Sequence, residues 1–420
     1  MSVQPDIEPA VAKRDGFVHQ MLRRLSDEGA SDLLLVAGVR PTIYVRGEWR
    51  ELDIAPPSAD ALADAFKELL SADQVQRLES SKDLDLALEI PGIARYRANL
   101  HYQRGTLAAA FRSIPNDVPS FDSLNLPPQV LSFADYPNGL VLVTGGTGQG
   151  KSTTLATLVD HINQTRAAHV ITIEDPVEFA FTNKKCLIEQ REIGSDSPSF
   201  ASALRHVLRQ RPDVIVIGEL RDLETISTAL TAAETGHLVF GSLHTSSTAQ
   251  TLARIIDVFP PIQQPQIRVQ LAASLRSIVC QTLLRDQMND LLIPATEILI
   301  ATTGVRRALR ENETHLINSM IETGRSQGMH TLEQNLAELV MDGRVDKEEA
   351  LASATDRARL ARLIGDTGVV DDLLTSRRQG RPVGRGIGVT GRFQDASFCL
   401  RGPRQLRKDG GGRCHRCVTQ

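Results

Sequence analysis

The sequence predicts a mixed α/β fold, in which a small α+β domain precedes a larger α/β domain and several C-terminal helices. From about residue 126 to residue 299, short continuous apolar runs alternate with helical stretches. Strands that are apolar on both faces belong in a sheet covered by helices on both sides. Before residue 115, helical spacing alternates with strands bounded by Gly and Pro. The composition of the 420 residues, 41% hydrophobic and 23% charged, excludes a wholly disordered or collagen-like chain.

The small domain is predicted to contain two helices and three strands. Apolar residues at helical spacing predict helices over 17–28 and 59–78. The predicted strands are the segments 32–38, 40–47 and 95–103. Pro115 and Pro119 favour an extended linker. We therefore divide the chain into an α+β domain (1–114), a linker (115–125), an α/β domain with C-terminal helices (126–370) and a basic tail (371–420).

Four apolar runs predict the strands of the larger domain, namely 139–144, 169–173, 213–218 and 237–243. Beyond Pro294 the pattern becomes helical, with separate helices expected over 301–310, 314–323 and 332–341. After Leu374 the chain is rich in Arg and Gly and poor in apolar residues, which predicts disorder.

Charge divides the chain unevenly. The formal net charge is −4, but residues 375–420 hold eleven Lys and Arg against two Asp, a net of +9 that leaves −13 for residues 1–374. Five cysteines without regular spacing favour a reducing compartment. The N-terminus has no secretory pattern, and no run is long enough to span a bilayer. We therefore expect a cytoplasmic protein that associates with membrane only peripherally. Cys414 and Cys417 have the spacing of half a zinc site, but an unligated tail is the favoured interpretation.

A glycine-rich segment fits the phosphate-binding pattern of Gly, four residues, Gly, Lys and Ser or Thr. A predicted strand enters it and a predicted helix over 152–163 leaves it, as the motif requires. Backbone N–H groups and the helix N-terminus would hold phosphate, Lys151 would contact the β- and γ-phosphates, and Ser152 would bind Mg²⁺. The expected binding residues are Gly145, Gly146, Thr147, Gly148, Gln149, Gly150, Lys151, Ser152 and Thr153.

Carboxylates follow two of the other predicted strands. Glu219 comes directly after the run 213–218, where an acid that holds Mg²⁺ or activates water is expected. Glu174, Asp175 and Glu178 follow the run 169–173, and one of them could accept a proton from the attacking water. The alternative for each acid is a solvated turn residue or a helix cap. Because both groups should leave the same edge of the sheet as the phosphate loop, a shared site is favoured.

His237 and His244 stand at the two ends of the predicted strand 237–243. A strand of this length spans about 20 Å, so the two histidines are unsuited to share one metal ion. His244, at the carboxyl end, is the better candidate for contacting phosphate.

Taken together, these motifs resemble the secretion ATPase superfamily and, within it, the type IV pilus retraction ATPases of the PilT and PilU types. The resemblance covers about residues 17–365, and four boxes occur in the order of that family: 145–153, 171–179, 208–226 and 231–245. It implies a RecA-like ATPase core with a helical C-terminal extension behind a PAS-like N-terminal domain. It also implies that ATP and Mg²⁺ bind between the subunits of a homohexamer.

Roles for single residues follow from the same resemblance. Glu178 would be the general base, Glu219 would act on the metal or water together with Ser152, and His237 and His244 belong to the histidine box. Arginines of the N-terminal domain and linker would reach the phosphates and neutralise charge in the transition state. The matching residues are Arg97, Arg104 and Arg112.

The resemblance also predicts the direction of the motor. Assembly ATPases usually carry a four-cysteine zinc insert, whereas only Cys186 and Cys280 occur between Gly145 and Leu374. The segment 304–311 resembles a box associated with retraction, with a predicted apolar stripe of Val305, Ala308 and Leu309 that leaves Arg306, Arg307 and Arg310 exposed.

We expect a retraction motor that acts through an inner-membrane platform protein, with a related accessory ATPase as a further partner and no specific nucleic acid. The alternatives are a pilus assembly or type II secretion ATPase and a RecA-like nucleic-acid translocase. The acidic body disfavours a translocase, and the basic tail keeps it open.

Overall fold

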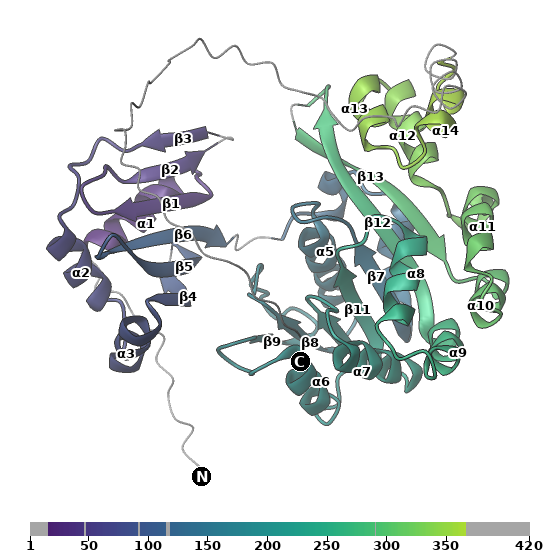
Figure 1. Ribbon diagram of the computed structural model, residues 1–420, viewed down its shortest axis with the longest axis horizontal. Helices are drawn as coiled ribbons and strands as arrows, with labels where there is room; N and C mark the ends of the chain where they lie inside the picture. Colours follow the sequence, from purple (N-terminus) through teal and green to yellow (C-terminus); the bar gives the residue numbers. More distant parts are fainter. Residues whose placement is uncertain (1–15, 46–47, 91–92, 115–117, 290, 367–420) are drawn as a thin grey trace, which may run out of the picture. The chain divides into compact units, whose positions relative to one another are not determined.

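The computed structural model describes residues 16–45, 48–90, 93–114, 118–289 and 291–366 (Figure 1). The tail, with Cys414 and Cys417, lies outside these residues. The boundaries predicted at residues 114, 125 and 370 stay predictions. Among helices of the described residues, none combines the length and the apolar character that crossing a bilayer requires.

The first part of the chain forms an antiparallel sheet with helices packed against it (Figure 1). The strand order is β3-β2-β1-β6-β5-β4. The helices are α1 (Phe17–Asp27), α2 (Ala59–Lys67) and α3 (Ala72–Ser81). The strands are β1 (Asp32–Val36), β2 (Thr42–Val45), β3 (Glu48–Glu51), β4 (Asp83–Ile90), β5 (Ala94–Gln103) and β6 (Thr106–Ile114). The predicted helix over 17–28 and the three predicted strands are therefore confirmed, and β3, β4 and β6 are additional.

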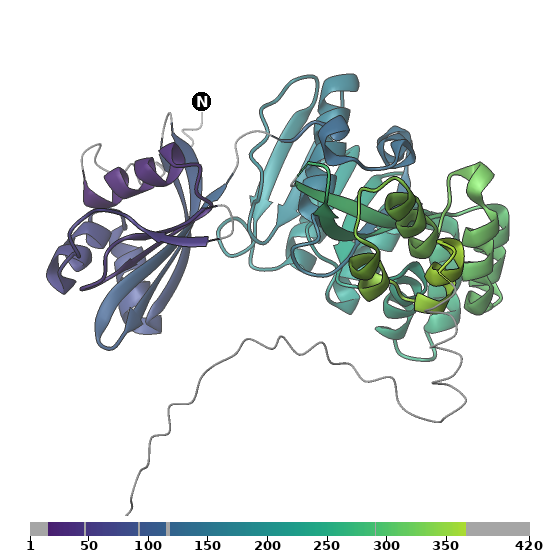
Figure 2. The same ribbon diagram turned by 90° about the horizontal axis from the view of Figure 1, so that it is seen from above.

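One apolar face of α1 holds this helix on the small sheet (Figure 2). Met21, Leu22 and Leu25 recur at helical spacing and are all buried. Beneath them, the hydroxyl of Tyr96 on β5 donates to the backbone oxygen of Leu22 at 2.8 Å, and burial raises the pKa of Tyr96 to about 12. This long-range hydrogen bond thus satisfies the hydroxyl of a fully buried ring.

The prediction of a single helix over 59–78 is wrong, because the chain forms two helices there. Helix α2 ends at Lys67, and α3 begins after Ser71. The Ser71 hydroxyl accepts from the Gln74 backbone N–H, and the Gln74 side chain accepts from the Ser71 N–H. This capping box starts a new helix within an otherwise continuous apolar pattern.

The second sheet is almost entirely parallel and has the order β13-β12-β7-β11-β10-β8-β9. Its strands are β7 (Gly139–Thr144), β8 (His169–Glu174), β9 (Leu187–Glu192), β10 (Val214–Ile217), β11 (Leu238–Leu243), β12 (Leu275–Asp286) and β13 (Leu291–Ile300). Only β13 pairs antiparallel, with β12. All four predicted strands are confirmed, and so is the mixed α/β class. Strands β9, β12 and β13 were not predicted from the sequence.

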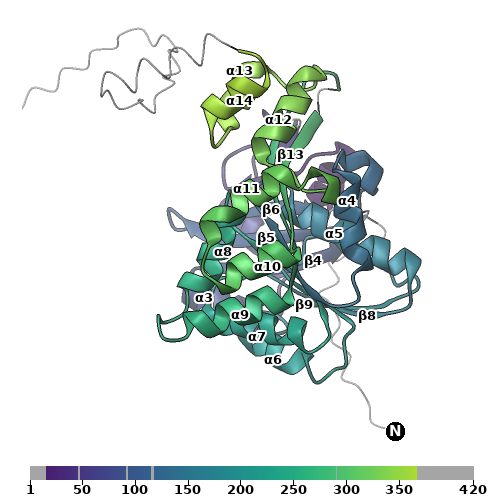
Figure 3. The ribbon, with the colours of Figure 1, turned by 90° about the vertical axis from the view of Figure 1, so that its right-hand side faces the viewer.

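Helices cover both faces of this sheet (Figures 1 and 3). Side chains along β7 alternate between the faces: Leu140 and Leu142 pack with one core, and Val141 and Val143 with the other. One face is covered by α4 (Pro128–Leu131) and α5 (Lys151–Thr165), and the other by α6 (Phe200–Val207), α7 (Leu223–Glu234), α8 (Thr248–Asp257) and α9 (Gln264–Ser274). The continuous apolar runs are thus explained by burial on two sides.

The helices after the sheet are α10 (Thr303–Arg310), α11 (Ile317–Thr323), α12 (Leu332–Met341), α13 (Lys347–Ser353) and α14 (Arg357–Leu363). The expectation that the chain is helical beyond Pro294 is wrong up to Ile300, where β13 ends. Helices α12 to α14 pack with Leu284 of β12 and with Ile293 and Ala295 of β13 into a separate core. Figure 3 shows α12 beside β13.

The predicted apolar stripe of α10 is confirmed, since Val305, Ala308 and Leu309 are buried. The predicted exposure of all three arginines is wrong for Arg306. Its guanidinium donates to four backbone oxygens at 2.8 to 2.9 Å, those of Ala272, Ala273, Leu275 and Ala301. Arg306 therefore ties α10 to the carboxyl end of α9, where a cation is favoured.

We predict that one ion pair makes the stability of the C-terminal helices depend on pH. Asp286, buried at the end of β12, accepts from the Arg344 guanidinium at 2.5 and 3.1 Å. The guanidinium holds the pKa of Asp286 well below its usual range. A lowered folded pKa stabilises the folded chain above about pH 4, near the unfolded pKa of Asp, and this contribution is lost as pH falls further.

The measurement is the free energy of unfolding of the wild type and of Asp286→Asn across this range. We expect the variant to be less stable at neutral pH and the difference to shrink below about pH 4. A difference that stays constant with pH would contradict the role of the charge.

Candidate nucleotide site

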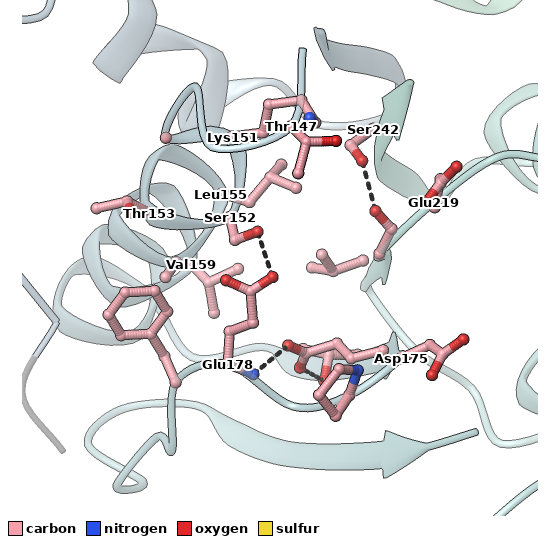
Figure 4. Close-up of a pocket in the computed structure, with 18 of the residues that line it drawn as sticks. Thr147, Lys151, Ser152, Thr153, Leu155, Val159, Asp175, Glu178, Glu219 and Ser242 are labelled. Carbon is pink, nitrogen blue, oxygen red and sulfur yellow. Dashed lines mark hydrogen bonds between the residues drawn. The ribbon is translucent and has the colours of Figure 1, made fainter. Parts of the chain in front are cut away.

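Loops from the carboxyl ends of parallel strands enclose a cavity of about 220 Å³ (Figure 4). The phosphate loop follows β7, the segment 175–179 follows β8, Glu219 follows β10 and His244 follows β11. All four segments line the cavity. The register explains this, because Thr144 pairs with Leu243 and Ile217 pairs with both Ile173 and Gly241. The strands therefore end within two residues of one another, as in other sheets whose ligands bind at this edge.

The phosphate loop needs glycine at particular positions. Gly145 has φ +147°, and a Cβ there would lie 2.4 Å from the backbone oxygen of Gln281 on β12. Gly150 has φ +76° and is the N-cap of α5. No side chain fits at the first position and few tolerate the second, which leaves the backbone free to turn into the helix N-terminus.

Lys151 lies over the loop that it follows. Its ammonium donates to the backbone oxygens of Gly145 at 2.9 Å and Gly146 at 2.7 Å. Burial lowers the pKa of Lys151, and the carboxylates of Glu219 and Glu178 oppose that shift. The ammonium is thus held by groups that a negatively charged phosphate can replace.

Ser152 and Glu178 meet across the cavity (Figure 4). The Ser152 hydroxyl donates to the Glu178 carboxylate at 2.8 Å. Below it, Glu174 accepts from the Thr172 hydroxyl at 2.6 Å, from the Gln190 amide at 3.2 Å and from the Glu178 backbone N–H at 3.3 Å. Burial raises the pKa of Glu174 despite these bonds. Glu174 therefore supports the loop, while Glu178 presents its carboxylate to the cavity.

Glu219 is held by a cation and a histidine. Its Oε2 atom lies 2.7 Å from Arg221 and 3.2 Å from Nε2 of His244. Burial would raise the pKa of Glu219, but Arg221 and His244 together lower it. Nδ1 of His244 lies 3.4 Å from the Lys151 ammonium, so the imidazole stands between Lys151 and Glu219. His244 also lies 3.5 Å from the Thr147 hydroxyl.

The structure does not bring every predicted residue to this cavity. His237 lies at the amino end of β11, where its Nδ1 is 3.0 Å from the Ala232 backbone oxygen, and it does not line the cavity. Its inclusion among the site residues is therefore not supported, since the length of β11 separates it from His244. Arg97, Arg104 and Arg112 belong to the β5–β6 hairpin and do not line the cavity either.

The three arginines also differ in position along their hairpin. Arg97 pairs directly with Arg112 across the two strands, and Arg112 binds Asp32 at 2.7 Å. Arg104 is at the turn, seven residues beyond Arg97 and thus about 20 Å away at the rise of an extended strand.

Several residues of the site were not given a role by the sequence analysis. Arg221 lines the cavity beside Glu219. Gln281 on β12 donates to the Gln149 backbone oxygen at 2.5 Å and accepts from Thr154 at 3.0 Å. Arg221 follows the predicted acid in sequence and could have been proposed from that. Gln281 lies more than 120 residues from the loop it supports, so no local pattern marks it.

Mg²⁺ suits the chemistry of the cavity. Ser152, Glu178 and Glu219 supply hydroxyl and carboxylate oxygens, which this ion prefers. Among the described residues, no group of three or more His, Cys, Asp and Glu has the arrangement of a metal site. A magnesium ion is commonly held by one or two protein side chains together with water and substrate phosphates, so the side chains fit that mode.

Comparison with known proteins identifies the family. A protein-family model described as "Type II/IV secretion system protein" matches residues 122–377 of this chain. The type IV pilus retraction ATPase PilT of Pseudomonas aeruginosa is 42% identical over 337 residues, which are 80% of this chain and 98% of that protein. A twitching motility protein of Neisseria gonorrhoeae is 43% identical over 315 residues, covering 75% of this chain and 84% of the relative.

The fold of this chain is also similar to a solved structure of a pilus retraction motor. The crystal structure of the pilus retraction motor PilT with bound ADP superposes with a TM-score of 0.77 at 42% identity, covering 82% of this chain and 98% of the other. The family match takes in more than half of the chain, and the relatives are matched over most of their own length. The chain therefore belongs to the type II/IV secretion system protein family, as a relative of the pilus retraction ATPases.

Proposed function

We propose that this chain is a Mg²⁺-dependent ATPase that works as a homohexamer and powers type IV pilus retraction, and so twitching motility. One observation carries the proposal. Lys151 and Ser152 of the phosphate loop share a single cavity with the carboxylates of Glu178 and Glu219. The chemistry is supported by that cavity, and the biological direction by the similarity to a pilus retraction ATPase and a twitching motility protein.

In this proposal, the residues on each side of the cavity have different roles in ATP hydrolysis. The backbone N–H groups of the loop and the Lys151 ammonium bind the β- and γ-phosphates. Ser152 and Glu219 would hold Mg²⁺, which would supply positive charge to neutralise the phosphates. Glu178 accepts a proton from water as the water oxygen bonds to the γ-phosphorus, and the bond from that phosphorus to the oxygen of ADP breaks. The Ser152 hydroxyl, which now donates to Glu178, must leave it for this step.

Arginines from a neighbouring subunit complete the site in this proposal. Arg97 and Arg112 are cross-strand neighbours, so both can approach one phosphate group, whereas Arg104 is about 20 Å further along the hairpin. Arg97 and Arg112 therefore form one candidate pair for neutralising transition-state charge, and Arg104 must act at a different point. Arg112 must also exchange its bond to Asp32 for phosphate.

The partners follow from the motor function. An inner-membrane platform protein would receive the work at the cytoplasmic face of the membrane, and a related ATPase could act beside the hexamer. Retraction is preferred to assembly because residues 145–374 contain two cysteines, too few for the four-thiolate zinc insert of assembly motors.

Substituting Lys151→Ala should lower the ATPase rate by about a hundredfold or more, because a preorganised charge at the phosphates is removed. The matched control is Lys184→Ala, since Lys184 pairs with Asp160 on the surface. Steady-state phosphate release from both variants is the measurement. Undiminished turnover in Lys151→Ala would contradict the proposed site.

Substituting Glu178→Gln should leave nucleotide binding intact and slow hydrolysis by about 10² to 10⁴-fold, the usual contribution of a general base. Binding of a fluorescent ATP analogue and single-turnover hydrolysis separate the two effects. Glu189→Gln, which alters an exposed acid paired with His169, serves as the control. If Glu178→Gln abolished binding instead, its role as a base would be wrong.

Deleting the encoding gene should abolish surface motility while pili remain or accumulate, because removal of pilin would stop and assembly would continue. Motility on a surface and the number of pili per cell are the measurements. Loss of pili would point to the assembly alternative, and unchanged motility would contradict both.

A further inference from the structure

Glu297 is a buried carboxylate that the proposed hydrolysis does not use. It lies on β13 and is 8% exposed. Its Oε1 atom accepts from both the backbone N–H and the hydroxyl of Thr248, each at 2.7 Å. Thr248 is itself fully buried and is the first residue of α8. Glu297 therefore satisfies the amino end of a helix that packs against β12 and β13 (Figure 1).

The first turn of α8 in turn fixes the loop that precedes it. The Thr251 hydroxyl donates to the Ser247 backbone oxygen at 2.8 Å and lies 2.7 Å from the Thr245 hydroxyl. The Ser246 hydroxyl donates to the Gln250 side chain at 2.9 Å. Each residue of 245–247 is thus bonded to the first turn of α8, so movement of that turn carries the loop with it.

His244 is the residue that this loop presents to the nucleotide site. It contacts Glu219 at 3.2 Å, Lys151 at 3.4 Å and Thr147 at 3.5 Å. Its side chain is 40% exposed, so the surrounding protein encloses it only in part. Its position therefore depends on the backbone of the loop, and through α8 on Glu297.

The same carboxylate reaches a second helix. Burial raises the pKa of Glu297, and the backbone N–H groups of Thr248 and of Leu332, the first residue of α12, oppose that shift. Helix α12 leads into α13 and α14, which form the separate C-terminal core. Glu297 thus connects the loop of His244 with the C-terminal helices through one side chain.

We propose that Glu297 is a positioning residue for ATP hydrolysis: its contact with Thr248 sets α8 and the loop 244–247, and so places His244 against Glu219 and the phosphate loop. The inference rests on the proposed ATPase function. A purely structural role for Glu297 would stabilise the fold without any specific dependence on His244.

The test compares the same substitution at two buried glutamates in the full-length protein. Glu297→Met removes the acceptor for Thr248, and Glu333→Met removes an equally buried carboxylate that accepts from the Asp356 backbone N–H at 2.9 Å. We expect Glu297→Met to lower kcat about tenfold, the effect of losing a hydrogen bond to a charged group, while the Kd for ATP changes less than about threefold. Glu333→Met should leave kcat within about twofold of wild type.

A double-variant cycle with His244→Ala separates positioning from general destabilisation. If Glu297 acts through His244, Glu297→Met should cost about tenfold in the wild-type background and less than about twofold in the His244→Ala background. Thr248→Val is a milder second variant, which removes one of the two bonds and should show the same dependence with a smaller loss. Equal losses in both backgrounds would overturn the proposal, as would an equal loss from Glu333→Met.

A readout without hydrolysis keeps this inference distinct from the proposed function. Amide hydrogen exchange at residues 244–248 should be about tenfold faster in Glu297→Met than in wild type, and unchanged in Glu333→Met. Inactive wild-type protein would contradict the ATPase proposal. Unchanged exchange at these residues would overturn the role of Glu297, whether or not ATP is hydrolysed.

Discussion

The parallel pairing of β7, β11, β10 and β8 is the constraint on which the nucleotide site depends. It aligns the carboxyl ends of four strands, so that the phosphate loop, His244, Glu219 and Glu178 leave one edge of the sheet. Side chains alternate along a strand, and a shift of one residue would turn every strand side chain to the opposite face. Both faces are packed against apolar cores, so such a shift would place each side chain against the wrong neighbours, and close-packed cores tolerate that poorly.

Strands β12 and β13 add a layer of buried polar groups behind that edge. Gln281 holds the phosphate loop, and its backbone oxygen excludes a side chain at Gly145. On β13, opposite Cys280 in the register, Glu297 holds the start of α8. These groups are satisfied by hydrogen bonds within the protein, so their geometry is well defined. The rigid part of the site thus extends beyond the residues that face the cavity.

The sequence predicts the strands that are buried on both faces, because their apolar runs are continuous. It does not reveal β9 at the edge of the sheet, whose residues LIEQRE are largely polar, nor β12, which follows α9 without a break. The break between α2 and α3 escapes the apolar pattern because Leu69 and Leu70 continue it, although Ser71 and Gln74 have the spacing of a capping box.

The site residues also fall into two groups, those in local sequence motifs and those whose partners are distant in the sequence. Lys151, Ser152, Glu178, Glu219 and His244 stand in local motifs and could be proposed from sequence. Gln281 and Glu297 act on segments far away in the chain, so only the fold pairs them with their partners. His237 shares a motif with His244 but not its end of the strand. The distance between residues Arg97 and Arg104 likewise depends on the hairpin, which the motif does not specify.

The most direct test of the central claim is a structure of the full-length protein with Mg²⁺ and a non-hydrolysable ATP analogue. The account predicts that the β- and γ-phosphates lie on the backbone N–H groups of residues 145–152, with Lys151 turned from the oxygens of Gly145 and Gly146 to phosphate. It also predicts that Glu178 and His244 face the γ-phosphate. A nucleotide bound elsewhere, or a Glu178 carboxylate turned out of the cavity while nucleotide is bound, would contradict it.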